Sequence, residues 1–393
     1  MNSLSKIKSL ILGYSRTSLL VLAALLFAAV PLMADLIGVW TPKANLQVAR
    51  GRHTSTLLPN GTALIAGGID SSGHATGALE LYDPATDTFK PIAATLPVPV
   101  SDHTATLLQD GTILIVGGKA DDGRPVTAAA LFDSSSNAAK SVGSMANARY
   151  AHTATLLPDG TVLIAGGSDG SNAQASTELY DPASQSFVGG PNLVSARQNH
   201  VASQLLDGRV LIVGGSEGAG PLASAEIFNP DDRSVTSTGP MQVARTLAAG
   251  ATLVDGRVLI TGGQDTNQQD LASAEIFDPK VNAFTAIASS LATPRSGHVA
   301  LQLDANGNVL VAGGTSAGAT VESTELFDAA TASFVPSGGF VAARSLFGTN
   351  FFAMPSGAMV LASGGLGADA APLASSEAFA YPTVKTATFR ATR

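Results

Sequence analysis

Seven Gly-Gly pairs recur along this chain at nearly constant spacing, and this repeat constrains the fold more than any other feature of the sequence. Successive pairs lie 48 to 51 residues apart: Gly67-Gly68, Gly117-Gly118, Gly166-Gly167, Gly214-Gly215, Gly262-Gly263, Gly313-Gly314 and Gly364-Gly365. A period of this length is typical of arrays of small units, each of which buries its core against its neighbours. The repeat therefore predicts the architecture, but it does not identify a ligand or a reaction.

The third unit shows the pattern within one repeat. We expect four strands, at residues 152–157, 161–165, 176–180 and 186–189. Asp159-Gly160 suits a two-residue hairpin turn, in which both central residues take positive φ. The second strand is almost continuously apolar, as in a strand packed on both faces. It ends at Gly166-Gly167, where the missing Cβ atoms allow another part of the backbone to approach closely.

The other units keep the same order of features. Each has Arg-x-x-His or a variant of it, a strand, Asn/Asp/Ser-Gly, a strand ending in Gly-Gly, a variable loop, and an aromatic residue that is usually followed by Asp-Pro or Asp. Over residues 38–380 this pattern resembles the kelch repeat. The resemblance implies an all-β, seven-bladed β-propeller of kelch type, since four short strands in each of seven units suit blades arranged around an axis.

A propeller has to cover the free edges of its first and last blades. Only six fourth strands lie between the seven copies of the first three strands, but Trp40 stands ten residues before Arg50, as Phe187 stands ten before Arg197. We therefore expect residues 39–42 to supply the fourth strand of the seventh blade. No aromatic residue follows Phe379 at the matching offset, so residues 381–393 are interpreted as a C-terminal tail or linker.

The N-terminal segment 1–34 has the pattern of an export signal or a membrane anchor. Lys6, Lys8 and Arg16 precede fifteen uncharged residues at 19–33, and Ala34 could end a cleaved signal peptide. An uncleaved anchor and a buried structural segment are the alternatives, although fifteen residues fall short of the roughly 20 that span a bilayer. The first two readings place the repeats outside the cytoplasm: secreted, periplasmic or on a bacterial cell surface.

Charge and cysteine content exclude several classes of partner and site. The formal net charge is −8, and it becomes −11 if the three N-terminal cations are removed with their segment. Such an acidic protein repels phosphate backbones, so we expect no nucleic-acid partner. The chain has no cysteine, which excludes disulfides, thiolate metal sites and the crosslinked tyrosine–cysteine cofactor of kelch-type galactose oxidases. That resemblance therefore concerns the fold alone.

Five histidines occupy one repeat position: His53, His103, His152, His200 and His298. A ring of imidazoles around an axis could bind a metal. We favour the structural interpretation, in which each histidine anchors a strand or turn by hydrogen bonding, because equivalent positions on different blades should lie too far apart for metal–ligand bonds of about 2 Å.

Six units carry a glutamate two residues before the third-strand aromatic: Glu80, Glu178, Glu226, Glu275, Glu325 and Glu377. The second unit has Ala130 there, and it also has Val100 where the other units have arginine. This joint absence indicates buried Arg–Glu pairs, because either charge alone would be costly. A paired-carboxylate hydrolase is the alternative, but symmetric glutamates do not provide one acid and one distinct base.

Sequence variation concentrates in the loops that follow Gly-Gly, as it does in loops that carry recognition. These loops lie at 69–78, 119–127, 168–175, 216–222, 264–271, 315–321 and 366–373, with His74, Asp121, Asp122, Arg124, Asp169, Asp265 and Asp369 as their reactive side chains. We interpret the chain as a non-catalytic, monomeric binding or scaffold protein that recognises a protein or a glycan through these loops. The alternative is a carbohydrate-active enzyme such as a sugar epimerase or lyase. No residue is assigned to catalysis, a cofactor or a metal.

Overall fold

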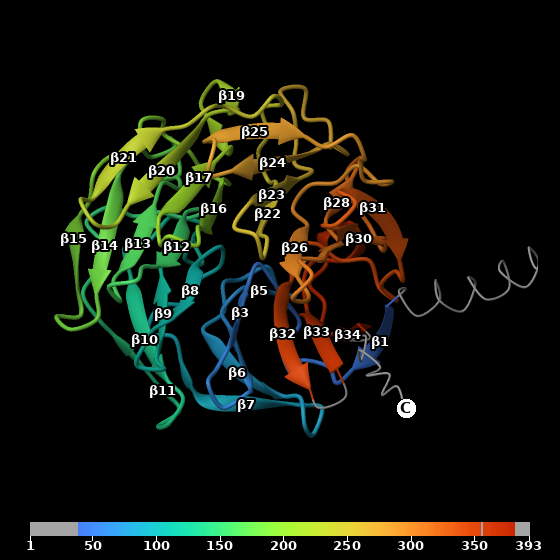
Figure 1. Ribbon diagram of the computed structural model, residues 1–393. Coiled ribbons are helices and arrows are strands. Elements are labelled where there is room, and N and C mark those ends of the chain that lie inside the picture. The colour runs from blue at the N-terminus through green and yellow to red at the C-terminus, as the bar shows by residue number, and fades with distance from the viewer. Residues whose placement is uncertain (1–37, 355–356, 382–393) are drawn as a thin grey trace, which may run out of the picture.

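The chain forms a ring of seven four-stranded antiparallel sheets around one axis (Figure 1). The computed structural model describes residues 38–354 and 357–381. In each blade the strands run outward from the axis, beginning with β3, β8, β12, β16, β22, β26 and β32. The predicted all-β, seven-bladed propeller is confirmed.

Blades 2 to 4 have the same strand lengths, whereas the two outer strands of blade 1 are longer. Blade 1 contains β3 (Thr54–Leu57), β4 (Ala63–Ala66), β6 (Ala78–Asp83) and β7 (Thr88–Thr95). Blade 2 contains β8 (Thr104–Leu107), β9 (Ile113–Val116), β10 (Ala129–Asp133) and β11 (Ala138–Ser141). Blade 3 contains β12 (Thr153–Leu156), β13 (Val162–Ala165), β14 (Thr177–Asp181) and β15 (Ser186–Gly189), and blade 4 contains β16 (Val201–Gln204), β17 (Val210–Val213), β20 (Ala225–Asn229) and β21 (Ser234–Ser237).

The last three blades complete the ring. Blade 5 contains β22 (Ala249–Thr252), β23 (Val258–Thr261), β24 (Ala274–Asp278) and β25 (Ala283–Ala286). Blade 6 contains β26 (Val299–Gln302), β27 (Val309–Ala312), β30 (Thr324–Asp328) and β31 (Ser333–Ser337). Blade 7 contains β32 (Gly348–Met354), β33 (Gly357–Ser363), β34 (Ser376–Tyr381) and, from the start of the propeller, β1 (Val39–Lys43).

Short elements form in the loops after Gly-Gly or, in the case of β2, pair with such a loop. They are β2 (Arg50–Gly51) paired with β5 (Ile69–Asp70), β18 (Ser216–Glu217) with β19 (Gly220–Pro221), β28 (Thr315–Ser316) with β29 (Ala319–Thr320), and the 3-10 turn η1 (Ala368–Ala370). No helix in the described ranges is long and apolar enough to cross a membrane.

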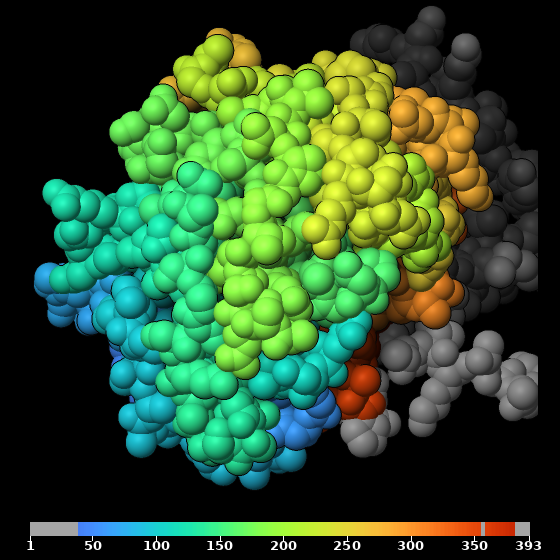
Figure 2. Space-filling model, turned by 90° about the vertical axis from the view of Figure 1, so that its left-hand side faces the viewer, coloured from blue at the N-terminus to red at the C-terminus, as the bar shows by residue number. Residues whose placement is uncertain are grey.

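The hydrophobic core lies between neighbouring blades. The second strand of each of blades 1 to 6 is buried along its whole length, as its continuous apolar run predicts. In one cluster, Leu114 and Val116 of blade 2 pack with Val162, Ile164 and Tyr180 of blade 3. Seen from the rim, the blades pack against one another without a break (Figure 2). A blade therefore depends on both neighbours for its core.

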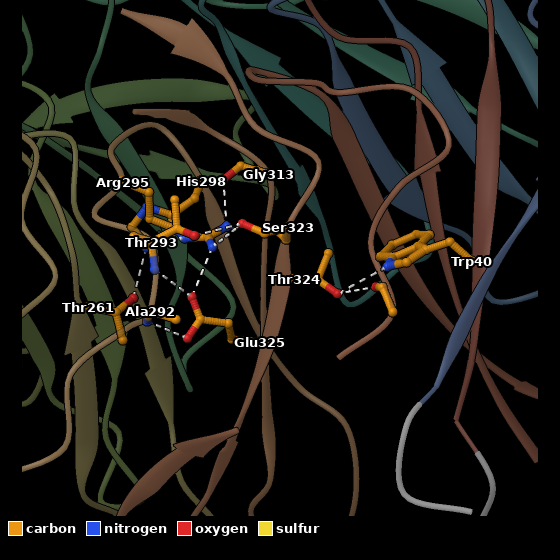
Figure 3. A network of polar contacts seen from close by, with 11 residues as sticks. Trp40, Thr261, Ala292, Thr293, Arg295, His298, Gly313, Ser323, Thr324 and Glu325 are labelled. Carbon is orange, nitrogen blue, oxygen red and sulfur yellow. Dashed lines mark hydrogen bonds and ion pairs between the residues drawn. The ribbon is translucent and has the colours of Figure 1, made fainter. Parts of the chain in front are cut away.

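The ring closes through β1, as predicted. Trp40 pairs with Phe379 in the antiparallel register between β1 and β34, and its side chain is only 4% exposed. The indole ring lies 4.1 Å from the ring of Phe340, and its Nε1 donates to Oγ1 of Thr324 in blade 6 (3.4 Å; Figure 3). The strand thus covers the edge of blade 7 and also ties it to blade 6.

Two sequence expectations need correction. The loop between β12 and β13 spans 157–161 and is not a two-residue turn: only Gly160 takes positive φ (86°), while the carboxylate of Asp159 accepts hydrogen bonds from the Thr161 N–H and hydroxyl. Aspartate is therefore selected for its carboxylate. In addition, β34 extends to Tyr381, which the sequence placed in the tail. The rest of that tail and the segment 1–34 lie outside the described residues.

The Gly-Gly pairs fulfil their predicted role at the contacts between blades. Gly117 takes φ of 64°, and a Cβ there would lie 2.6 Å from the Arg149 carbonyl oxygen and 2.7 Å from Cε1 of His152, both at the start of blade 3. Gly118 would similarly meet the carbonyl oxygen of Ser101 at 2.4 Å. Only glycine combines this backbone conformation with this close approach.

Candidate functional site

The residue before each ring histidine, or its replacement, takes a left-handed conformation at the axis. These seven residues, with φ between 50° and 59°, are called here the mouth ring: Arg52, Asp102, Ala151, Asn199, Leu247, Gly297 and Leu346. Their backbones link successive blades. The N–H of Asp102, for example, donates to the carbonyl of Arg52 (3.1 Å), and that of Arg52 donates to the carbonyl of Leu346 (3.0 Å). This backbone arrangement is repeated, while the side chains differ from blade to blade.

The mouth ring lies on the same face as the variable loops. The residue after each repeat arginine, or after Val100 in blade 2, pairs with the first residue of its blade's loop, as in Ser101 with Lys119 and Ser345 with Leu366. We call this side of the ring the loop face. The turns between first and second strands, with Asp159-Gly160 among them, lie on the opposite side.

A cavity of about 320 Å³ is lined by residues of the mouth ring and their neighbours. Its polar arc is formed by Arg52, Asp102 and Asn199 from blades 1, 2 and 4. The facing arc, from blades 5 to 7, is largely apolar and includes Leu247, Ala248, Val299, Leu346 and Phe347. Such a cavity suits a ligand with one polar and one apolar side.

An ion pair stands at the polar end of this cavity. Nη1 of Arg52 donates to Oδ1 of Asp102 at 2.8 Å, and the two side chains are 35% and 16% exposed. The hydroxyl of Ser101 also donates to the Asp102 carboxylate, to Oδ2 at 3.4 Å. The pair holds the guanidinium at the mouth while leaving part of it open to solvent.

A second hollow, of about 680 Å³, runs between the loops of blades 6 and 7. Small side chains and backbone from β28–β29 and η1 form its walls, including Gly318, Ala319, Ala368 and Ala370. Arg52 and Leu346 line both this groove and the mouth cavity. The two hollows therefore meet at Arg52.

The five ring histidines form hydrogen bonds between blades, in agreement with the structural interpretation. Nε2 of His152 lies 2.9 Å from Oγ1 of Thr104, which begins the first strand of the preceding blade, and His103 and His200 make corresponding contacts with Thr54 and Thr153. His298 instead contacts Thr261, at the end of the second strand of blade 5. His53 lies 3.5 Å from the hydroxyl of Ser363 in blade 7. Burial, assisted by nearby guanidinium groups, lowers the pKa of four of these histidines to about 3 and that of His103 to about 4. They are neutral links between blades.

The six predicted Arg–Glu pairs are present and buried. They join Arg50–Glu80, Arg149–Glu178, Arg197–Glu226, Arg245–Glu275, Arg295–Glu325 and Arg344–Glu377. Figure 3 shows one of them: Nη2 of Arg295 donates to Oε1 of Glu325 (3.0 Å) and Nη1 to the carbonyl of Gly313 (3.1 Å). The same carboxylate accepts the backbone N–H groups of Ala292 and Thr293. Each pair thereby fixes the connection between blades.

Blade 2 replaces this network with apolar contacts. Val100 and Ala130 stand in place of the arginine and the glutamate, and a cavity of about 20 Å³ lies beside them. Pro97 occupies the position whose N–H donates to the glutamate in the other units. Without that N–H there is one donor fewer to satisfy, so the three replacements are mutually consistent. Pro97 is visible in the sequence, but only the structure shows that its position supplies an N–H donor to the glutamate in the other units.

The reactive loop residues do not converge on one site. Nδ1 of His74 contacts the Asp121 carboxylate at 2.8 Å and is exposed, as is the contact between Arg124 and Asp122. The carboxylates of Asp169 and Asp265 accept backbone N–H groups of their own turns. Asp369 alone lines the groove. Sequence reasoning missed the mouth ring, whose signal was a position next to the histidine that varies among Arg, Asp, Asn, Leu, Ala and Gly.

Comparison with known proteins supports the fold. A model of the kelch motif matches residues 245–290, which form most of blade 5. The chain has no match among curated proteins. Among solved structures, a fungal alcohol oxidase of the AA5 family, in complex with copper, aligns with 88% of this chain and 76% of its own, at 18% identity and a TM-score of 0.70. At this identity the similarity shows the fold alone.

The residues present do not fit a copper site. No group of three or more His, Cys, Asp and Glu side chains in the described ranges could hold a metal ion. The ring histidines are held by hydroxyl groups of neighbouring blades, and the chain has no cysteine. The repeated pattern and the closed ring of seven four-stranded sheets show that the chain is a seven-bladed β-propeller, and the matched kelch motif lies in its fifth blade.

Proposed function

We propose that this protein is an exported, non-catalytic binding or scaffold protein that recognises a protein or a glycan on its loop face. One observation carries the proposal: the mouth cavity and the groove meet at Arg52, and apart from four ring histidines (His53, His103, His200 and His298) the mouth cavity is lined by side chains that differ among blades. The polar groups that repeat are buried and already have partners: each repeat arginine pairs with a glutamate, and each ring histidine contacts a hydroxyl group of a neighbouring blade. Recognition therefore depends on the non-repeated residues.

The charge pattern of the site favours a ligand that is polar at one end. Arg52 and Asp102 largely neutralise each other, and Asn199 supplies both a donor and an acceptor nearby. Leu247 and Leu346 offer an apolar wall opposite them. Peptide backbone and sugar hydroxyls both match such a mixed surface.

A binding screen with residues 35–393 against glycan and peptide arrays tests the proposal. Saturable binding that is weakened by Asn199→Leu at the mouth, but not by Leu206→Ser on the opposite face, supports it. Leu206 is a suitable control because its side chain is 72% exposed in the turn between β16 and β17, on the side of the ring opposite the loops. Blank arrays, or binding that responds to Leu206→Ser instead, refute it.

A carbohydrate-active enzyme of the sugar epimerase or lyase type is the second candidate. It is favoured by the unlike residues Arg52, Asp102 and Asn199 at non-equivalent positions around one mouth. Incubation with the glycans that bind, followed by mass spectrometry of the products, distinguishes the two functions. Turnover that Asp102→Asn abolishes would establish the enzyme, whereas unchanged glycans support binding alone.

Export and a monomeric state belong to the same proposal. The basic and apolar segments before Ala34 motivate the export signal. N-terminal sequencing of the protein recovered from its native cell, together with light scattering, tests both points. A first residue near Asp35 and a monomeric mass support them, while an intact N-terminus in a cytoplasmic fraction contradicts export.

A further inference from the structure

The guanidinium of Arg52 has more hydrogen-bond donors than partners. A guanidinium carries five N–H groups. In Arg149, the repeat arginine of blade 3, Nε, Nη1 and Nη2 all donate to the protein, and their acceptors include Gly166 and Glu178. Within the described part of the chain, the Arg52 side chain donates a single hydrogen bond, from Nη1 to Asp102. Of its five N–H groups, four therefore remain for a ligand or for water.

The Asp102 carboxylate also has acceptor positions to spare. Among the described residues, its Oδ1 accepts from Arg52 at 2.8 Å, and Oδ2 has only a long contact of 3.4 Å with the Ser101 hydroxyl. An ionised carboxylate has about four acceptor positions. The surrounding loops contain eight acidic residues and two cations, so the field on this face attracts positive charge. The acidic residues are Asp70, Asp121, Asp122, Asp169, Glu217, Asp265, Asp270 and Asp369, and the cations are Lys119 and Arg124.

A notch lies in the apolar arc that faces this ion pair. Blade 6 contributes Gly297 to the mouth ring, between Leu247 of blade 5 and Leu346 of blade 7. A Cβ atom at Gly297 would have no neighbour closer than 3.9 Å, which is its distance to Cδ2 of Leu346. The space beside the glycine backbone is therefore open, and two leucines flank it. An apolar side chain of a ligand fits such a space.

The backbone of the mouth ring is interrupted on both sides of the cavity. All seven residues of the ring are described, and five of them donate their N–H to the carbonyl of the preceding blade's residue: Arg52, Asp102, Asn199, Leu247 and Gly297. The link is missing from Leu346 to Gly297 and from Ala151 to Asp102. The first interruption leaves the Leu346 N–H as a donor at the notch. The second leaves the Asp102 carbonyl as an acceptor beside its own carboxylate.

We propose that the mouth cavity binds a residue that carries a free α-ammonium group and an apolar side chain. The ammonium group donates to Asp102, the adjacent carbonyl or carboxylate oxygen accepts from Arg52, and the side chain occupies the notch beside Leu346. A volume of about 320 Å³ is near the lower end of the range for ligand pockets, so the cavity suits one residue.

This inference rests on the proposed function and names the ligand class for the same face. The first residue of a polypeptide and a free amino acid share the required chemistry, and capture of an N-terminal amine is an established mode of peptide recognition. The acidic loops favour either ligand over one that presents only a carboxylate.

Fluorescence anisotropy tests the inference with Leu-Gly-Gly-Lys-amide, labelled on the lysine side chain, and two analogues with the same label. N-acetylation removes the charged donor and should weaken binding at least about tenfold. Glycine in place of the first leucine should also weaken binding at least about tenfold, because no apolar side chain is then buried in the notch. Competition with L-leucine distinguishes the two sources. Displacement near the Kd of the peptide assigns the site to free amino acids, displacement by peptides alone assigns it to chain ends, and either result supports the shared recognition.

Two substitutions copy residues that other blades have in the mouth ring, so the left-handed backbone is retained. Asp102→Asn, which copies Asn199 of blade 4, should reduce the affinity for the free amine to that for the acetylated peptide. Leu247→Ala, which copies Ala151 of blade 3, should weaken the leucine peptide at least about threefold. Asp169→Asn is the matched control: it removes the same charge from a loop outside the cavity, so affinity should change less than about twofold.

Unchanged melting temperatures establish that the variants fold. Equal binding of the free and acetylated peptides, no binding of either, or a preference for the free amine that survives Asp102→Asn overturns the inference. Array ligands that have no free α-amino group and depend on Asn199 but not on Asp102 would refute it while leaving the proposed function intact.

Discussion

Mild acid should unfold this propeller, because five buried imidazoles have to remain neutral in the folded state. Burial lowers the pKa of His152 to about 3, and the charges of Arg149 and other neighbours act in the same direction. In the unfolded chain the pKa of each histidine returns to about 6.5. Between these values the unfolded state binds more protons than the folded state, so stability falls as the pH falls from 6.5 towards 3.

The expected loss in the free energy of unfolding is large because all five histidines contribute to it with the same sign. Each proton taken up on unfolding lowers the free energy of unfolding by about 1.4 kcal/mol per pH unit. Because the unfolded histidines are half protonated at pH 6.5, five of them over the interval from pH 6.5 to about pH 5 give a total of about 8 kcal/mol, comparable with the whole stability of many domains. The exposed carboxylates affect stability only at a lower pH than this interval. For example, the backbone N–H of Ala183, with its neighbours, holds the pKa of the Asp181 carboxyl below 3.8.

Urea unfolding at a series of pH values measures this slope. Trp40 is the single tryptophan of the chain, and it is buried at the ring closure, so its fluorescence reports the folded state directly. His152→Phe should reduce the slope by about one fifth. Blade 7 already has Phe347 at this position, lying against Gly313 as His152 lies against Gly117. The Thr104 hydroxyl loses its partner, which costs about 1 kcal/mol at every pH.

His74→Phe is the control, because His74 is exposed in a loop and outside the ring of histidines. It should leave the slope unchanged. A free energy of unfolding that stays constant between pH 6.5 and 5 would refute the reasoning. So would a His152→Phe variant whose slope equals that of the unaltered protein, because neutral imidazole burial would then not be the cause.

Three further substitutions test the contacts between blades. Glu178→Gln leaves Arg149 buried without its counter-charge and should destabilise the protein by about 3–5 kcal/mol, measured by urea unfolding; an unchanged midpoint would contradict the pairing. Trp40→Ala should cost about 3–5 kcal/mol in calorimetry and expose the edge of blade 7 to association; a monomer of normal melting temperature would count against the closure. Gly117→Ala should destabilise more than Gly123→Ala, because both have positive φ but only Gly117 faces close neighbours; equal effects would show that backbone conformation alone matters.

The architecture was predictable because its signals are local and repeated. Three signals lie within short stretches of sequence: the Gly-Gly spacing, the apolar second strands and the offset between Trp40 and Arg50. Because the pattern occurs in seven units, a departure in one unit does not hide it. The joint absence at Val100 and Ala130 even revealed a tertiary contact. The turn at Asp159-Gly160 was predicted wrongly because an aspartate is favoured in turns for two reasons: it tolerates positive φ, and its carboxylate accepts hydrogen bonds from the turn. The sequence does not distinguish these reasons, and the second is the one that applies here.

The candidate site was not predictable from the same signals. Arg52 and Leu346 are 294 positions apart, and only closure of the ring brings them to one cavity. This relation has no period, so it cannot be recognised by comparing one unit with the next.

Symmetry itself separates structural from functional residues in this fold. Arg50 and Arg52 are two positions apart, yet Arg50 is fully buried against Glu80, whereas Arg52 is partly exposed at the mouth. The first arginine recurs in five other blades, and the second occurs once. A contact that every blade needs has to be repeated in every blade. A ligand on the axis presents a different side to each blade, so the residues that bind it have to differ from one blade to the next. The positions at which the mouth ring departs from sevenfold regularity are therefore those at which substitution should alter binding without altering the melting temperature.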